Sequence, residues 1–467
     1  GGSVPMEQRK FRMPTAYTIL FCLILLVALS TWLIPAGSYD YADGIPISGS
    51  YHAVAPAPQG IGAALKAAFR GFYDAVDVCV FILMVGGFLG VVMKTGAIDA
   101  GVSNVISRLQ GRENLLITIL MLFFGLGGTT YGMWEETMAF YPLLIPVFLA
   151  AGYDAVVGIS VILLGAGAGV IASTVNPFAT GIAAGFAGVS LGEGIVLRLL
   201  EWVAFEAAAI WFVMAYAAKV KKNPSKSVVG VGAGKIQVSM DQQVSFTAKR
   251  KVIMALFTLT FLIMVYAVVP FDEMGLSLPA LGWWFPELSA LFLVAGVVIG
   301  LIDRMSEEEL VETYVAGCAD LLGVAFIIGI SRGITVLMND GAITDTVLHW
   351  GEQALSGAGA ISFTLLVFAL YLPLTILIPS SSGLATLSIP IVAPLGKFAG
   401  VGGDLVVTAF QSASGLVNII TPTAAVVMGA LALGHVPYDR WVKYVWKLIL
   451  WFLLLALAFL VAGVLLG

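Results

Sequence analysis

Charged residues interrupt long apolar stretches of this sequence at two places. Glu135 and Glu136 follow the string GLGGTTYGMW, and Arg332 lies within FIIGISRGITVLM. On membrane-insertion scales such a charge costs roughly 2.5–3.5 kcal/mol, so it usually marks a partner or a pathway. The two carboxylates could neutralise a cationic ligand, hold a proton or cap a helix. The guanidinium could grip a carboxylate of a ligand, or it could pair with Glu135 or Glu136.

A second chemical signal is a set of four interruptions rich in Gly, Ser, Thr, Asn and Pro. Residues 125–137 and 378–386 have the composition of hairpin tips, and residues 172–178 and 418–423 break apolar helices. Unwound backbone inside a membrane is tolerated only against protein or a water-filled cavity. Its carbonyls, with hydroxyl and amide oxygens, could coordinate a cation, and the restarting helix N-termini favour a carboxylate. For any single break, a Pro or Gly kink is the alternative.

These features together predict a binding site with no catalytic residue and no metal. The predicted substrate-binding residues are Thr129, Thr130, Tyr131, Glu135, Glu136, Asn176, Arg332, Ser380, Ser381, Ser382, Asn418 and Thr421. The predicted residues for a coupling cation are Ser173, Thr174, Asn176, Asn418, Thr421 and Thr423. Coupling could use Na+ at the breaks or H+ on a glutamate, and antiport would need neither. No other cofactor is expected, because the three cysteines and three histidines lack metal-type spacing.

The composition requires that a membrane surround these segments. Of the 467 residues, 60% are hydrophobic and only 11% are charged, against about 25% charged in ordinary soluble domains. Several stretches approach or exceed the ~20 apolar residues that cross a bilayer; they are residues 14–36, 195–218, 252–270 and 441–466. We therefore expect a multi-pass membrane protein, with the lipid bilayer and a small solute as partners and no nucleic acid.

Lysine and arginine positions predict the orientation of the chain. Arg9, Lys10 and Arg12 place the N-terminus in the cytoplasm, where residues 1–13 comprise a tag remnant and a short leader before the first span. The segment 220–251 is rich in lysine and predicts a cytoplasmic linker between two halves, 14–219 and 252–467. Continuing this count places the C-terminus outside the cell.

The two halves are related in sequence. FILMVGGFLGVVMKTGAI (81–98) aligns without a gap to FIIGISRGITVLMNDGAI (326–343), and the motifs PLLIP, GYDAVV and STVNP recur in order as PIVAP, GGDLVV and NIITP. The charge rule sends the first of the aligned segments inward and the second outward. We therefore predict an all-α polytopic fold of two inverted-topology repeats. Each repeat has a re-entrant hairpin and a broken helix, and nine spans plus two hairpins satisfy the charges. Asp154 and Asp404 would cap the broken helices.

Several long strings give the chain a family resemblance. MPTAYTILF and WLIPAGSYD near the N-terminus, GTTYGMWEETMAFYPLLIP, ISRGITVLMNDGAI and PSSSGLATLSIPI resemble the YfcC family, which is related to the DcuC-type anaerobic carriers and ArcD-type arginine/ornithine exchangers. The resemblance implies an elevator-type carrier of the ion-transporter group and a homodimer. Its mobile transport domain would comprise segments 78–188 and 318–433, and its scaffold segments 14–36, 195–219, 252–302 and 438–466.

The expected function is secondary active transport of a small charged solute. The glutamate pair favours a basic amino acid such as arginine or ornithine, carried alone or by antiport, with Arg332 or helix N-termini holding its α-carboxylate. Arg332 and the helix termini also fit the alternative, an ion-coupled carrier of a C4-dicarboxylate or another carboxylate anion. A channel and an intramembrane hydrolase are remote alternatives; the hydrolase lacks an HExxH motif and a histidine at membrane depth. An enzyme is therefore not expected.

Overall fold

The computed structural model describes most of the chain. The described residues are 16–43, 45–108, 111–174, 176, 179–189, 192–230, 245–268, 271–272, 275–283 and 285–467. Three predicted site residues, Tyr131, Glu136 and Ser382, have side chains outside the described set. The segment 1–13, and residues 231–244 of the predicted linker, also lie outside the described set.

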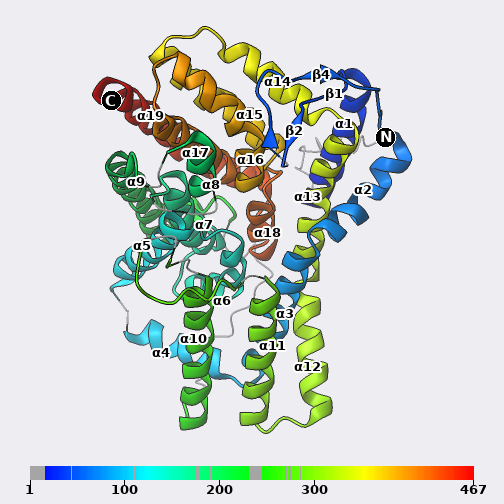
Figure 1. The fold of residues 1–467 in the computed structure, drawn as a ribbon. Coiled ribbons are helices and arrows are strands. Elements are labelled where there is room, and N and C mark those ends of the chain that lie inside the picture. Colours follow the sequence, from blue (N-terminus) through cyan, green and yellow to red (C-terminus); the bar gives the residue numbers. More distant parts are fainter. Residues whose placement is uncertain are drawn as a thin grey trace, which may run out of the picture.

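The described part is built almost entirely of helices, with four two-residue strands near its N-terminal end (Figure 1). The first half contains α1 (Ala16–Leu33), β1 (Gly37–Ser38), β2 (Tyr41–Ala42), β3 (Ile45–Pro46), β4 (His52–Ala53), α2 (Ile61–Asp74), α3 (Val76–Lys94), α4 (Ala97–Arg108), α5 (Glu113–Tyr131), η1 (Glu135–Ala139), α6 (Tyr141–Ala150), α7 (Ala155–Ile171), α8 (Thr180–Ala187), α9 (Ile195–Lys222) and η2 (Pro224–Lys226). The second contains α10 (Ala248–Val268), α11 (Phe285–Ile302), α12 (Glu307–Asp320), α13 (Leu322–Asp340), α14 (Thr344–Leu355), α15 (Ala360–Leu377), α16 (Ser381–Phe398), α17 (Gly403–Asn418), α18 (Ala425–Leu433) and α19 (Tyr438–Leu466).

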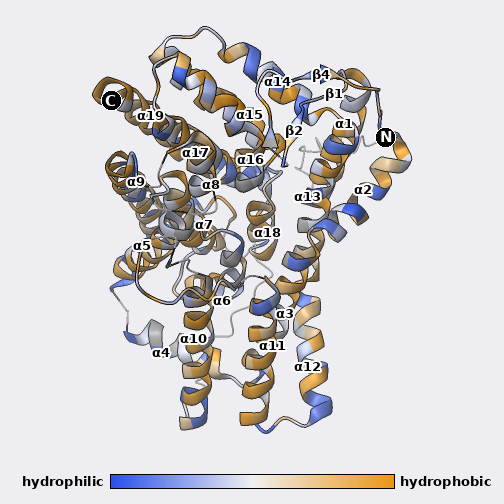
Figure 2. Ribbon diagram, viewed as in Figure 1, coloured by the Kyte–Doolittle hydropathy of each residue, from blue (hydrophilic) through white to orange (hydrophobic). Residues whose placement is uncertain are grey.

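Apolar residues dominate the long helices, as expected for a membrane protein (Figure 2). Among the described residues, α5, α11, α15 and α19 are long and apolar enough to cross a bilayer. The helices α2 and α3 pass the same test together as a pair bent by 66°. Several shorter apolar helices, among them α6 and α7, occur at the predicted hairpins and breaks. The multi-pass class is thus supported, and the count of nine spans stays a prediction.

The helices of the second half repeat the order of the first. A hairpin, α5–η1–α6, precedes the broken pair α7–α8 and the long α9, and α15–α16, α17–α18 and α19 follow in the same order. The packing is matched as well: α2 contacts α13 while α3 contacts α12, and α8 contacts α16 while α18 contacts α6. The first helix of each pair thus packs on the second helix of the other pair. The pairs α2–α3 and α12–α13 therefore run antiparallel along each other (Figure 1).

Glycines allow these antiparallel helices to approach closely. A side chain at Gly71 of α2 would overlap the backbone of Gly329 and Gly333 on α13. On the other pair, Gly86 of α3 and Gly317 of α12 lie against each other's backbone in the same way. Small residues at a helix contact let the backbones pack closely, which is a main source of helix association in membranes.

The two broken helices lie at the centre of the molecule. All residues of α7 are buried, and so is α17 from Leu405 to Asn418. The helices α5 and α9 pack on α7, and α15 and α19 pack on α17, while α7 and α17 contact each other. Because a helix that is apolar on all sides is stable only inside a bundle or a membrane, these contacts place the two breaks deep within the protein.

Candidate functional site

A cavity of about 410 Å³ lies where the hairpin tips meet the second helix break. Its walls come from five places along the chain: the end of α2, the first tip, helix α13, the second tip and the break between α17 and α18. The chemically active residues among its lining are Asp74, Glu135, Arg332, Ser380, Asn418 and Thr423. Five of these are predicted site residues, so the structure brings together segments that are far apart in sequence.

The first tip is formed by a glycine turn and a short 3-10 helix. Helix α5 ends at Gly132, whose φ of 76° is the left-handed conformation that glycine adopts without strain. A side chain there would also overlap the amide of Asn176. Glu135 then begins η1 and lines the cavity beside Trp134. Trp134 occupies the N-cap position of η1, and its side chain makes no capping hydrogen bond.

The first helix break is held by hydroxyl groups from α5. Thr129 donates through Oγ1 to the carbonyl of Ala172 at 2.7 Å, and the backbone N–H and hydroxyl of Thr174 donate to the carbonyl of Thr129. Ser173 donates to Val170 at 2.8 Å. These bonds satisfy backbone groups that the break would leave unpaired. The described residues of the break lie beside the first tip and outside the lining of the 410 Å³ cavity.

Two further predicted residues of the first repeat, Thr130 and Asn176, also lie outside this lining. Thr130 donates to the carbonyl of Leu126 within its own helix at 2.6 Å. Asn176 is buried, and its Oδ1 accepts weakly from the backbone of Ala179 at 3.4 Å.

The second tip and second break form one wall of the cavity. Ser380 is the N-cap of α16 and accepts from the N–H of Gly383 at 3.3 Å, while Ser381 begins the helix. Asn418, the last residue of α17, donates from Nδ2 to the carbonyl of Pro379 at 3.3 Å, so it ties the break to the tip. Its Oδ1 is buried and has no hydrogen-bond partner in the described part of the chain. This oxygen therefore has unused hydrogen-bonding capacity in a residue that lines the cavity.

In the second break, Thr421 and Thr423 form a hydrogen bond with each other. The hydroxyls of Thr421 and Thr423 are 2.8 Å apart, and Thr423 lines the cavity. Two aromatic residues of α19 fix the unwound backbone: Trp441 donates to the carbonyl of Ile419 at 3.0 Å, and Tyr438 donates to that of Ile420 at 2.6 Å. The break is thus a supported structure with oxygens beside the cavity.

Arg332 pairs with a residue that sequence reasoning missed. Its Nη1 lies 3.1 Å from Oδ2 of Asp74, the last residue of α2. The predicted pairing with Glu135 is not among the ion pairs of the described residues, although both side chains line the cavity. Asp74 gave no signal in the sequence, because a carboxylate at the end of an amphipathic helix resembles an ordinary surface residue. Only the packing of α2 on α13 places it opposite Arg332.

A second ion pair joins the same helices one step away from the cavity. Arg70 of α2 pairs with Asp340 of α13, and neither residue lines the cavity. Asp340, the last residue of α13, thus takes part in an interhelical pair. Its neighbour Asn339 lines the cavity and accepts from the hydroxyl of Thr344 at 2.8 Å.

The two predicted N-caps have different outcomes. Asp154 caps α7 as expected, accepting from the N–H of Val157 at 3.0 Å. The prediction for Asp404 is wrong: Gly402 occupies the N-cap of α17, and Asp404 lies in the first turn of that helix. An acid in the first turn still interacts favourably with the helix dipole, so the pattern alone did not distinguish the two roles.

Sequence reasoning also missed three buried charged residues of α9, of which Arg198 and Glu201 bond to the broken helices. Arg198 donates to the carbonyl of Thr174 at 3.0 Å and so supports the first break from outside. One turn later, Glu201 is only 1% exposed and accepts from the hydroxyl of Ser412 on α17 at 2.6 Å. The signal was present, since both residues interrupt the apolar segment 195–218. They connect α9 to both broken helices.

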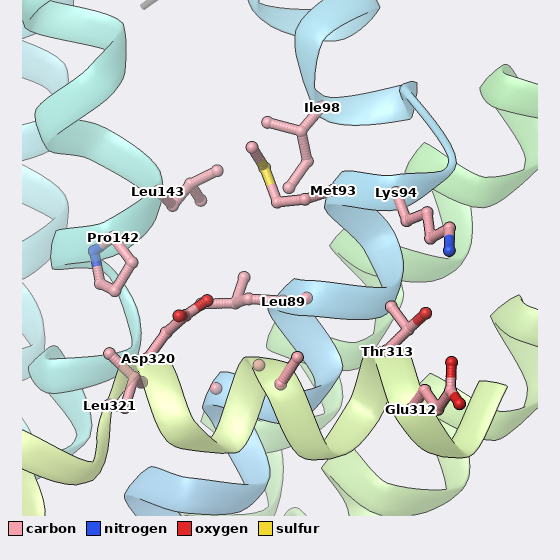
Figure 3. A pocket seen from close by; sticks show the side chains of 14 residues that line it. Leu89, Met93, Lys94, Ile98, Pro142, Leu143, Glu312, Thr313, Asp320 and Leu321 are labelled. Carbon is pink, nitrogen blue, oxygen red and sulfur yellow. The ribbon is translucent and has the colours of Figure 1, made fainter. Parts of the chain in front are cut away.

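A second cavity, of about 610 Å³, lies against α3, α4, α6 and α12. Figure 3 shows Asp320 beside Leu89, Pro142 and Leu143 in this cavity, and Lys94 and Glu312 at its far side. Asp320 is the last residue of α12, as Asp74 is of α2. This cavity contains neither a hairpin tip residue nor a break residue, so the 410 Å³ cavity is the better candidate site.

The letters GISRG at 329–333 match the GxSxG pattern of hydrolases, but the structure does not support that chemistry. A nucleophile elbow needs a sharp turn between a strand and a helix. Here the five residues lie inside α13, which is helical from Leu322 to Asp340. The candidate site therefore offers charges and oxygens for binding a solute.

Known proteins are similar to this chain over nearly its whole length. An uncharacterized protein of Haemophilus influenzae is 34% identical over 510 aligned positions that cover 98% of each chain. A protein of Escherichia coli K12 bearing the name "Putative basic amino acid antiporter YfcC" is 29% identical over 484 positions, which cover 93% of each chain. The predicted resemblance to the YfcC and DcuC group is thus confirmed.

Two solved transporters were also matched. The YdaH transporter of Alcanivorax borkumensis shares 15% identity at a TM-score of 0.43, with 95% of this chain and 98% of that chain covered. MtrF of Neisseria gonorrhoeae, from a class of antimetabolite efflux pumps, shares 17% identity at a TM-score of 0.41, with 96% and 94% covered. The sequence model of the C4-dicarboxylate anaerobic carriers matches residues 13–465, and the chain therefore belongs to this transporter family, DcuC.

Proposed function

We propose that this protein is a secondary active transporter of a basic amino acid such as arginine or ornithine, acting as a carrier or an antiporter. The observation that carries the proposal is the charge of the 410 Å³ cavity. One guanidinium, Arg332, and two carboxylates, Asp74 and Glu135, line it. With all three ionised, the described part of the lining has one excess negative charge, which a substrate of net charge +1 neutralises.

The groups of such a substrate match the groups of the cavity. Its α-carboxylate would bind Arg332 and compete with Asp74, which pairs with the guanidinium. The released Asp74 and Glu135 would then accept from the α-ammonium and the side-chain cation. At an effective dielectric constant near 20, two unit charges 4 Å apart interact by about 4 kcal/mol, so the number of carboxylates decides which substrate charge is favoured.

A C4-dicarboxylate or another carboxylate anion is the second candidate. The name of the family and the guanidinium of Arg332 favour it. Asp74 and Glu135 oppose it unless they bind protons or a coupling cation, because two ionised carboxylates repel an anion. A coupling Na+ near Asn418 and the Thr421–Thr423 pair, or a coupling H+ on Glu135, would supply that compensation.

An elevator movement between inverted-topology repeats is the mechanism that we propose for this transport. The antiparallel packing of α2–α3 on α12–α13 and the matched order of the helices support it. The sequence suggests a moving part of 78–188 and 318–433. The contacts group α3 and α13 with α2, α12, α1 and α11, and group α5–α9 with α15–α19. We therefore favour a moving part that begins at α5 and α15.

We also propose a homodimer in a bacterial cytoplasmic membrane, with the N-terminus inside and the C-terminus outside. The orientation can be tested with single cysteines at two exposed serines, Ser225 of η2 and Ser356 after α14. In intact cells, an impermeant maleimide should label S356C and leave S225C unlabelled. The reverse labelling would contradict the orientation and leave the substrate proposal intact.

Transport into proteoliposomes is the direct test of the substrate. Labelled arginine and ornithine should show saturable uptake, and uptake should accelerate when unlabelled arginine is loaded inside. A vesicle without protein and the R332Q variant are the controls. Absence of saturable uptake of either amino acid by the wild type would contradict the proposal. Competition by succinate without competition by arginine would favour the dicarboxylate instead.

A further inference from the structure

A third cavity, of about 780 Å³, lies between α9 and α19, away from the candidate substrate site. Four lysines from three separate segments line it: Lys219 of α9, Lys226 of η2, and Lys443 and Lys447 of α19. We call this hollow the α9–α19 groove.

The α9–α19 groove has a cationic end and an aromatic end. Along α9, Trp211 lies two turns before Lys219, and along α19, Trp451 lies one turn after Lys447. All four residues line the groove. Trp211 is 70% exposed and Trp451 is 61% exposed, so both indoles face the surroundings of the protein. Tryptophan prefers the level of the lipid headgroups and upper acyl chains, which suits a membrane-facing groove.

The floor of the groove is apolar although it contains two tyrosines. Tyr216 donates its hydroxyl to Oδ2 of Asp154 at 2.6 Å, and the hydroxyl of Tyr444 accepts from Ser160 at 3.0 Å. These bonds hold both hydroxyls toward the protein interior. The two rings pack edge to face with centroids 4.6 Å apart. The groove therefore offers ring carbons to a ligand, and among the described lining residues the cationic groups are the lysines at one end.

The four lysines are without ion pairs among the described residues, unlike three other lysines of the chain. Lys94, Lys221 and Lys249 pair with Glu309, Glu113 and Asp303. Lys447 does lie over the ring of Trp446, 5.8 Å from its centroid, but that contact leaves its charge uncompensated. Four converging ammonium groups beside an apolar floor are complementary to an anionic amphiphile.

We propose that the α9–α19 groove binds an anionic phospholipid whose headgroup carries two phosphates, with cardiolipin as the probe. The phosphates bind the four lysines, and the acyl chains lie on the tyrosine rings between the two tryptophans. This site is separate from the 410 Å³ cavity, and its occupation does not depend on which solute the protein transports.

Native mass spectrometry of the detergent-purified full chain tests the proposal. Cardiolipin, phosphatidylglycerol and phosphatidylethanolamine are titrated separately into the wild type and the K443Q/K447Q variant. Each lysine near an anionic headgroup contributes about fivefold to binding, so the double variant should bind cardiolipin roughly 25-fold more weakly. K443R/K447R, which keeps the charges, should bind as the wild type does.

The matched control removes the same charge elsewhere. K222Q/K397Q replaces two exposed lysines outside the groove and should leave cardiolipin binding unchanged. Equal binding by K443Q/K447Q and the wild type would overturn the proposal, and so would equal binding of phosphatidylethanolamine and cardiolipin. Displacement of cardiolipin by millimolar pyrophosphate would assign the lysines to a free phosphate. Conversion of a dimer to a monomer by W211A/W451A, with lipid binding unchanged, would assign the groove to a second copy of the chain.

Discussion

Arg332 on α13 and Asp74 at the end of α2 form an ion pair at the edge of the candidate site, with Nη1 and Oδ2 3.1 Å apart. Both side chains are partly exposed and line the same cavity. On the same two helices, Arg70 and Asp340 form a similar pair that does not line it. The two pairs therefore separate a role in binding from a role in holding the helices together.

The first prediction uses this contrast. D74N removes one of the two carboxylates in the described lining of the cavity, so we expect affinity for arginine to fall about tenfold or more and competition by succinate to increase. D340N should leave both unchanged. Partly exposed ion pairs contribute about 0–1 kcal/mol to stability, so both variants should melt near the wild type. Uptake competition and thermal unfolding in detergent provide the measurements. Equal loss of uptake in both variants would show that the pairs serve structure alone.

A second prediction concerns the close contact of α2 and α13. G71A places a methyl group against the backbone of Gly329 and Gly333. Overpacking of this kind costs typically about 1–3 kcal/mol, so the melting temperature and the yield of folded protein should fall. G62A, in the same helix with open space around it, should leave stability unchanged or slightly raised. If G71A and G62A have the same melting temperature, α2 and α13 are further apart than described.

The unpaired oxygen of Asn418 leads to a third prediction. N418A removes this oxygen from the cavity wall and also removes the bond from Nδ2 to Pro379. We expect uptake to fall by about tenfold or more, since a bond to a charged partner contributes roughly 1.5–3 kcal/mol. N418D keeps the oxygen, adds a negative charge and should retain more uptake than N418A. Transport by N418A at the wild-type rate would exclude Asn418 from the site.

A fourth prediction concerns the segment that covers α14. Tyr39 donates its hydroxyl to Glu352 at 2.6 Å, and Tyr41 donates to Asp345. Burial raises the pKa of both tyrosines above the ordinary value of about 10, and these hydrogen bonds are the second largest cause of the increase. The stability that they contribute is therefore complete below pH 10 and is lost as the pH rises above it, because the unfolded chain ionises first.

Melting temperatures between pH 8 and pH 11 test this dependence. The wild type should lose more stability over this interval than Y39F/Y41F, which cannot ionise at either position. Effects of alkaline pH on the rest of the protein are common to both proteins and cancel in the comparison. Parallel curves for the two proteins would show that the tyrosines ionise equally in the folded and unfolded chains.

Local patterns in the sequence were enough to predict much of the fold. The apolar segments indicated a membrane protein, and the recurring motifs anticipated the matched order of α5–α9 and α15–α19. Glycine, proline and small polar residues marked the tips and breaks, because they are poor residues for a continuous helix. The N-cap at Asp154 was predictable for the same local reason, whereas Asp404 shows that an acid near a helix start can lie one turn inside it.

The sequence by itself determined which segments are apolar and where they are interrupted, and it predicted Glu135, Arg332, Ser380 and Asn418, which line one cavity, as site residues. These properties follow from composition and spacing within short stretches. Only the tertiary structure decided that Asp74 neutralises Arg332, that the first break lies outside the 410 Å³ cavity, and that Arg198 and Glu201 support the broken helices. Such partners are set by which helix faces meet, and that depends on packing between residues hundreds of positions apart.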